Sequence, residues 1–286
     1  MNYRELLKDK KRVVIKVGSS SLIHKETNKL DLRKLEVLVR ELSDLHNQGK
    51  DVVLVTSGAV AVGASAFGMH EKPTELKKKQ ACSAVGQDAS DDDLSETFFQ
   101  STTSMAAQIL MTKNTMVNNL NRRNARNTFE ELLELGAIPV VNENDSISSY
   151  ELEMLESFGD NDTLSAVIAG LIGADLLILL SDIDGLFTDD PNTNPDAEFI
   201  DTVEVLDEKL LSMGKRTKEQ SRNRWNGYKT DCCRDSNGCR CGYGDCEWPG
   251  FSCDPQDHGR QKIWYLICRK PKKKSFFLID YIEKLL

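Results

Sequence analysis

Residues 138–145 read IPVVNEND, an apolar run that ends in four consecutive amide and carboxylate side chains. Short runs of Val and Ile bounded by polar residues are typical of strands buried on both faces of a parallel sheet. A second polar cluster, Asp160-Asn161-Asp162, opens the apolar helical pattern of Thr163–Ile172. Asn and Asp at a strand end can bind an ammonium group, and a cluster that opens a helix can organise cations around a phosphate. Taken singly, each cluster can equally be an Asx turn or a helix cap.

Three further apolar runs resemble residues 138–141. They are Arg12–Val17, Asp51–Thr56 and Leu176–Leu180, and stretches with helical periodicity separate the runs. These helical stretches are Asp31–Gln48, Ala106–Leu120, Thr128–Leu135 and Thr163–Ile172. Strands that alternate with helices predict an α/β fold, an open and mostly parallel sheet sandwiched by helices. Ligands of such sheets bind at the carboxyl ends of the strands.

Two strand ends lead into turns that can hold an anion. Lys16 precedes Gly18-Ser19-Ser20, and Ser57-Gly58-Ala59 follows the second strand. Turns of this kind expose backbone N–H groups, and a Lys adds a positive charge. A strand-end Lys can also be merely solvated. The chain has neither G-x-x-x-x-G-K-[ST] nor a G-x-G-x-x-G that opens a helix, so a phosphate site would be built from several strand ends.

Composition restricts the class of protein. The net charge of −8 argues against a nucleic-acid partner, and no run of about 18 apolar residues predicts a membrane span. Residues 1–12, MNYRELLKDKKR, have no apolar signal core, so we expect a cytoplasmic protein.

The motifs taken together resemble the amino acid kinase family, and within it the glutamate 5-kinases. The resemblance covers residues 11–87 and 105–213. Besides the strand ends above, it rests on residues 121–128, NRRNARNT, and 180–191, LSDIDGLFTDDP. It implies an amino-acid-kinase-like αβα fold that phosphorylates the γ-carboxylate of L-glutamate with ATP and Mg²⁺, the first step of proline biosynthesis. It also implies a homo-oligomer, and it leaves proline open as a feedback inhibitor.

The resemblance carries roles onto particular residues. Lys16 would neutralise the transferred phosphoryl group, Gly18 would donate its backbone N–H, and Asp162 would orient the lysines. Ser57, Asp145 and Asn161 would hold glutamate. Ser181 and Asp182 would lie beside the nucleotide together with Lys16. No protein-held metal is expected, because Mg²⁺ would ride on the ATP phosphates.

The last quarter of the chain has a different character. Residues 1–214 carry a net charge of −15 and residues 215–286 a net charge of +7. Seven of the eight Cys and all three Trp lie after residue 224. We therefore expect one kinase-like domain over residues 1–213. Residues 214–286 would be an aberrant tail that forms no domain, stays incomplete or disordered, and does not complete the sheet. We also expect no separate C-terminal RNA-binding domain.

A shift of reading frame explains this tail. The family carries a phosphate loop of the form G-T-G-G-M-x-T-K, which is absent here. Residues 222–230, RNRWNGYKT, can be encoded so that reading from the second base gives Gly-Thr-Gly-Gly-Met-Ala-Thr-Lys. The same offset turns residues 264–268 into Gly-Thr-Leu-Phe, and it converts Ala and Gly codons into Cys, Arg and Trp. Residues 88–104 interrupt the resemblance in a similar way, so the sequence predicts two slips and an impaired kinase.

A cysteine-rich metal or interaction module on a non-catalytic remnant is the alternative. Six Cys between residues 232 and 253 could supply thiolates. However, no C-x-x-C pair occurs, and structural zinc sites are typically built from two such pairs. The zinc content of the purified protein separates the two interpretations.

Overall fold

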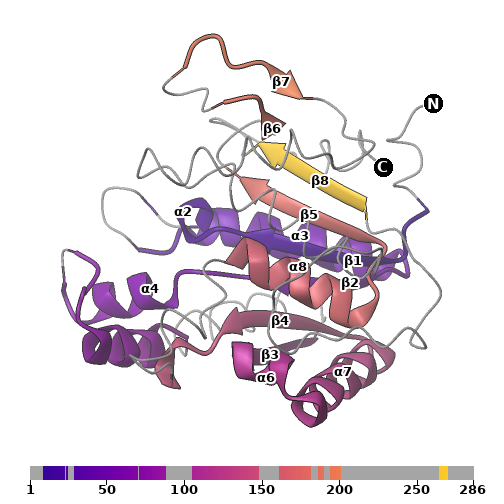
Figure 1. The fold of residues 1–286 in the computed structure, drawn as a ribbon, viewed down its shortest axis with the longest axis horizontal. Helices are drawn as coiled ribbons and strands as arrows, with labels where there is room; N and C mark the ends of the chain where they lie inside the picture. The colour runs from indigo at the N-terminus through magenta and orange to yellow at the C-terminus, as the bar shows by residue number, and fades with distance from the viewer. Residues whose placement is uncertain are drawn as a thin grey trace.

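The computed structural model describes residues 9–22, 24, 29–69, 71–87, 105–147, 161–181, 186–189, 194–200 and 264–269. Six parallel strands form one sheet in the order β3-β4-β2-β1-β5-β8 (Figure 1). Their bounds are β1 Arg12–Val17, β2 Asp51–Val55, β3 Met105–Met111, β4 Ala137–Glu143, β5 Leu176–Ser181 and β8 Trp264–Arg269. Two short antiparallel strands, β6 Leu186–Phe187 and β7 Phe199–Ile200, make a separate ribbon.

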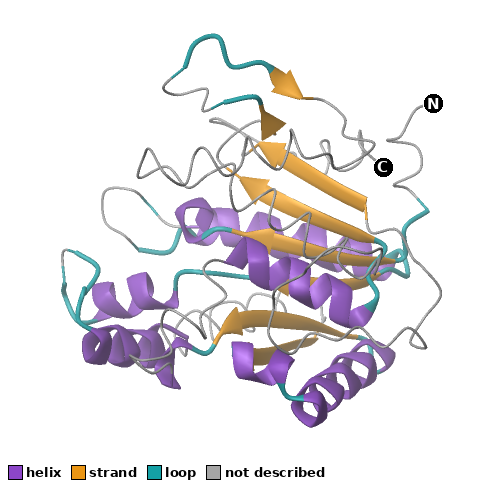
Figure 2. Ribbon diagram, viewed as in Figure 1, coloured by secondary structure: helices purple, strands orange, loops and turns teal. Residues whose placement is uncertain are grey.

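Helices lie on both sides of the strands (Figure 2), as predicted for this class of fold. They are α2 Ser19–Leu22, α3 Leu32–Asn47, α4 Ala59–Ala66, helix 76–87, α6 Lys113–Val117, α7 Asn119–Glu134 and α8 Asn161–Ile172, with a 3-10 turn η1 at Asp145–Ile147. No described helix is long and apolar enough to cross a membrane.

Alternating side chains of the central strands supply two separate hydrophobic layers. Val13 and Ile15 of β1 pack in a cluster with α3 residues such as Leu42. Val14, between them in sequence, packs in the opposite cluster with α8 residues such as Leu164. Because strand side chains alternate with a period of two, a strand covered on both faces must be apolar at every position. The uninterrupted apolar runs of the sequence follow from this burial.

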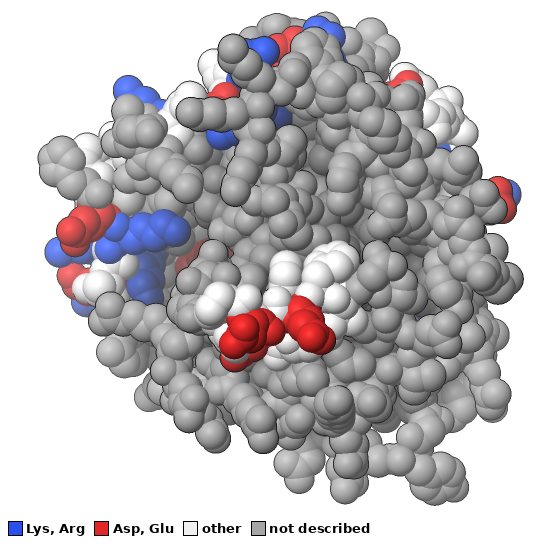
Figure 3. Space-filling view, turned by 90° about the horizontal axis from the view of Figure 1, so that it is seen from above, with Lys and Arg blue, Asp and Glu red and all other residues white. Residues whose placement is uncertain are grey.

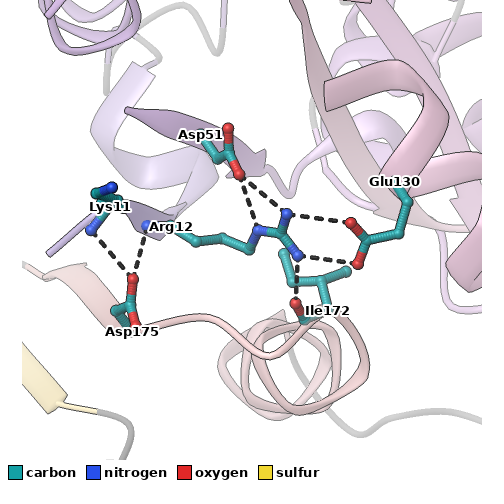
Figure 4. A network of polar contacts seen from close by, with 6 residues as sticks. All are labelled: Lys11, Arg12, Asp51, Glu130, Ile172 and Asp175. Atoms are coloured by element: carbon teal, nitrogen blue, oxygen red, sulfur yellow. Dashed lines mark hydrogen bonds and ion pairs between the residues drawn. The ribbon is translucent and has the colours of Figure 1, made fainter. Parts of the chain in front are cut away.

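Arg12 joins four elements at the amino end of the sheet (Figure 4). Its guanidinium donates to Asp51 of β2 at 3.0 Å, to both carboxylate oxygens of Glu130 of α7 at 2.9 and 3.1 Å, and to the carbonyl of Ile172 of α8 at 2.7 Å. Burial lowers the pKa of Arg12, but its hydrogen bonds to Glu130 and Asp51 outweigh that effect and raise it. Asp175 accepts from the backbone N–H groups of Lys11 and Arg12 at 3.0 and 2.9 Å. This network lies at the edge opposite the strand ends predicted to bind ligands.

Charges on the face shown in Figure 3 form small groups. Acidic and basic side chains lie together at the left of the view, and further acidic side chains lie near its centre. Among the side chains coloured in this view, no wide area carries charge of a single sign.

Two predictions about elements are wrong. Residues 106–120 were predicted to be helical, but β3 occupies Met105–Met111, and helices begin only at Lys113 and Asn119. Pairing with β4 over seven positions outweighs the helix propensity of Ala106 and Ala107.

Residues 215–286 were predicted not to complete the sheet, but one strand of this tail, β8, pairs with β5 over six positions and forms the edge of the sheet. Residues 201–263 and 270–286 lie outside the described part of the chain. So do residues 88–104, the segment that interrupts the resemblance to the family.

Candidate active site

An ion pair between β1 and α8 lies at the centre of the carboxyl edge of the sheet. Lys16 is the penultimate residue of β1, and Asp162 is the second residue of α8. Lys16 Nζ lies 2.6 Å from Asp162 Oδ1, and the two side chains are only 15% and 13% exposed. A charge removed this far from water requires an opposite charge close by. Asp162 therefore holds the ammonium group of Lys16 at the strand end.

Asn161 connects the ends of two neighbouring strands. Its side-chain amide donates to the backbone carbonyl of Thr56, directly after β2, and to Asn142 Oδ1 in β4 at 3.1 Å. The Thr56 N–H in turn donates to the carbonyl of Val141 at 2.9 Å. The first residue of α8 thus joins the carboxyl ends of β2 and β4.

The turn after β2 requires a glycine. Gly58 has φ 110° and ψ 3°, the left-handed conformation, and it is the residue from which α4 begins. Its carbonyl accepts from the N–H groups of Ala61 and Val62. Ser57, immediately before it, is half-buried between the end of β2 and this helix. The predicted Gly/Ser turn is therefore a sharp strand-to-helix connection at the same edge of the sheet.

Asp145 follows β4 and begins η1. The N–H of Asn144, one residue earlier, donates to the carbonyl of Met111 at the end of β3 at 2.8 Å. Burial raises the pKa of Asp145, and the positive charge of Lys79 on helix 76–87 partly offsets the shift. A half-buried carboxylate beside a strand end is suited to bind a cation such as an ammonium group.

The structure brings together most of the residues that the sequence singled out. Lys16, Asp162 and Asn161 are joined through the contacts above. The carbonyl of Gly18 accepts from the N–H of Ser21 in the first turn after β1. Ser181 ends β5 at the same edge, and Asp182 lies outside the described residues.

The predicted roles missed Asn142 and Lys79. Asn142 belongs to the polar cluster at the strand end, but only the fold shows that it accepts from Asn161. Nothing in the sequence indicated that Lys79 would lie near the site, because the helix that carries it contains no recognisable motif. Among the described residues, no three His, Cys, Asp or Glu side chains are close enough together to hold a metal ion.

The arrangement combines a mostly buried lysine-carboxylate pair, backbone turns and a half-buried acid along one sheet edge. It has the features of a site that binds a phosphate beside a small substrate that carries an ammonium group. Residues 11–221 match the profile of the amino acid kinase family. The chain belongs to the amino acid kinase family.

Similar proteins carry more specific names. The glutamate 5-kinase of Carboxydothermus hydrogenoformans is 48% identical over 207 residues, which are 72% of this chain and 54% of that protein. The glutamate 5-kinases of Clostridium perfringens and Enterococcus faecalis are 46% and 42% identical over 200 and 210 residues, which are 70% and 73% of this chain and 74% and 77% of those proteins. The match thus spans about half the length of the first relative and three quarters of the other two.

Solved structures share the fold at low identity. UMP kinase from Ureaplasma parvum superposes with a TM-score of 0.53 at 14% identity, over 80% of this chain and 87% of that one. Carbamate kinase from Giardia lamblia bound to AMP-PNP also gives a TM-score of 0.53 at 14% identity, over 80% of this chain and 90% of that one. At this identity the similarity concerns the fold alone, which matches the predicted αβα arrangement.

Proposed function

We propose that the site of this chain is built to transfer the γ-phosphoryl group of ATP to the γ-carboxylate of L-glutamate. The observation that carries the proposal is the Lys16–Asp162 pair, which lies beside the Asn161 bridge at the carboxyl edge of the sheet. The names of the relatives, 42–48% identical to this chain, support glutamate as the substrate.

This chemistry needs little proton transfer. The γ-carboxylate is already ionised at neutral pH, so it can attack in line without a general base. The protein then contributes positioning and charge stabilisation. Lys16 stabilises charge on the transferred phosphoryl group, Asp162 holds Lys16 in place, and Gly18 donates a backbone N–H. Mg²⁺ bound to the ATP phosphates would supply further neutralisation of their charge beside Lys16.

The remaining predicted residues divide between the two substrates. Asp145 binds the ammonium group of glutamate, and Ser57 and Asn161 hold the rest of the amino acid. Ser181 and Asp182 lie by the nucleotide. A homo-oligomer and inhibition by proline stay predictions from the resemblance, and a cytoplasmic location stays a prediction from the sequence of residues 1–12.

Glutamate binding can be tested by itself. Asp145→Ala should abolish it in calorimetry, because the ammonium group would lose its charged partner at a site that is partly shielded from water. Asp44→Ala, an exposed carboxylate on α3, is the matched control and should bind like the parent. Equal glutamate affinity of Asp145→Ala and the parent would refute the assigned role.

The chain as written is a poor catalyst in this proposal. The family profile ends at residue 221, immediately before the segment that reads as the Gly-rich phosphate loop only in a shifted frame. Loss of one preorganised donor alone lowers a rate by about 10²–10³, and several donors and a cation would be missing here. The same proposal treats residues 1–213 as the domain and residues 214–286 as an aberrant tail, of which β8 belongs to the sheet of the domain.

Rewriting the chain tests the impairment. The parent is compared with a variant in which two segments carry the amino acids that the shifted reading frames encode. These segments are residues 88–104 and the residues from about 216 onward. Acyl phosphate formed from glutamate and ATP is trapped with hydroxylamine. We expect turnover only in the rewritten protein, and equal turnover in both would refute the impairment. Stoichiometric zinc in the purified parent would instead support the alternative, a cysteine-rich metal-binding tail on a non-catalytic remnant.

A further inference from the structure

Gln87 makes a buried contact with the loop that carries Asp145. It is the last described residue of helix 76–87, and it is 5% exposed. Its side-chain amide Nε2 donates to the backbone carbonyl of Glu143 at 2.9 Å, across 56 positions of sequence. A polar side chain buried to this degree is expected to form a hydrogen bond with a specific group of the protein.

The group that accepts from Gln87, the carbonyl of Glu143, lies between Asn142 and Asn144 at the end of β4. The N–H of Glu143 donates to Asn142 Oδ1 at 2.9 Å, and the same oxygen accepts from Asn161 at 3.1 Å. The N–H of Asn144 donates to the carbonyl of Met111 at 2.8 Å. Gln87 supplies the hydrogen bond to the Glu143 carbonyl, so the backbone leading to Asp145 is held from several sides.

Gly86, the neighbour of Gln87, ties the same helix to the turn after β2. A Cβ atom on Gly86 would lie 1.8 Å from the carbonyl oxygen of Ala59 and 2.6 Å from the backbone nitrogen of Gly63. The two helix backbones are therefore in direct contact at the first turn of α4, which follows Ser57. Helix 76–87 contacts the turn that carries Ser57 on one side and the loop that carries Asp145 on the other.

We propose that Gln87 is a positioning residue that holds the Asp145 loop in register with the Ser57 turn for an amino acid substrate. The inference rests on the proposed function, because that proposal makes Ser57 and Asp145 binding residues. Without the amide donor, the Glu143 carbonyl loses its hydrogen bond from Gln87, and we expect the loop to shift so that water replaces this bond. Asp145, two residues further on, then leaves the position that meets the ammonium group.

Two variants and one control test this role. Gln87→Met keeps the length of the side chain and removes the donor, and Gln87→Glu keeps the shape and replaces the NH₂ group by oxygen. Gln48→Met is the matched control, because Gln48 also donates a 2.9 Å bond, to the side chain of Asp44, but on an exposed face of α3. Glutamate affinity is measured by calorimetry, and amide exchange of residues 143–146 is measured by NMR without any ligand.

We expect both Gln87 variants to bind glutamate about tenfold more weakly than the parent. The amides of residues 143–146 should exchange faster in both variants, whereas the amides of β1 should exchange at the parent's rate. Gln48→Met should match the parent in glutamate affinity and in amide exchange. Unaltered exchange at 143–146 would overturn the proposal, and so would failure of both variants to fold, since Gln87 would then be a core residue. If the parent binds no glutamate, the proposed substrate is wrong, and the exchange rates still decide whether Gln87 positions the loop.

Discussion

Lys16 Nζ lies 2.6 Å from Asp162 Oδ1, so the end of β1 and the first turn of α8 are joined by an ion pair that is largely shielded from water. The residues are 146 positions apart, and only the packing of α8 beside β1 brings them together. The pair neutralises a lysine that would otherwise be costly to bury. It also leaves that lysine at the strand end where a phosphate would bind.

The first prediction concerns this pair. Asp162→Leu should lower the free energy of unfolding by about 3 kcal/mol, because it leaves the Lys16 charge shielded from water without its partner. The double variant Lys16→Met/Asp162→Leu should regain most of that loss while failing to bind ATP. Urea unfolding of both single variants and the double variant gives the coupling energy. A coupling near zero would mean that the pair does not form in solution.

The second prediction concerns the pH dependence of Asp145. Its pKa is raised above the ordinary value of 3.8 because the carboxyl is buried. The folded state therefore binds the proton more tightly than the unfolded state, and stability is lost as pH rises through the raised pKa. Asp145→Asn should be more stable than the parent at pH 7, and the two should converge near pH 3 in thermal unfolding. A parent that is the more stable at pH 7 would contradict the assigned shift.

The third prediction concerns Arg12 at the opposite edge. Arg12→Met should lower stability by about 2–3 kcal/mol, because Asp51, Glu130 and the Ile172 carbonyl lose a shared donor. Arg40→Met removes an exposed pair with Glu36 on α3 and should change stability by less than about 0.5 kcal/mol. Chemical denaturation measures both. Similar losses in the two variants would show that the Arg12 network is no stronger than a surface pair.

The fourth prediction concerns the contact between α4 and helix 76–87. Gly86→Ala places a methyl group 1.8 Å from the Ala59 carbonyl oxygen, so the helices must separate and the protein should lose several kcal/mol or fail to fold. Gly49→Ala has open space around its Cβ position and carries only the strain of a φ of 82°. It should therefore cost only about 1 kcal/mol. Comparable melting temperatures for the two variants would show that the helices are not in contact.

Much of the architecture was predictable because local sequence and burial agree in the central strands. Arg12–Val17 is apolar on both faces, and the observed strand has these same bounds. The strands Asp51–Val55, Ala137–Glu143 and Leu176–Ser181 lie within two residues of their predicted ends. Since parallel strands place their carboxyl ends along one edge, the polar residues that follow them could be assigned to one site before their contacts were known.

What only the tertiary structure decided depends on pairing over long distances. The Ala106-Ala107 segment becomes an edge strand because β4 offers it a hydrogen-bonding partner, and β8 joins the sheet because β5 leaves one edge open. Helix 76–87 shows no ligand motif, yet Gly86 and Gln87 connect it to the two loops that carry Ser57 and Asp145. A sequence records which side chains could pair, whereas the geometry of the packed chain selects the partners, since a hydrogen bond or close contact forms only when both groups reach the same place.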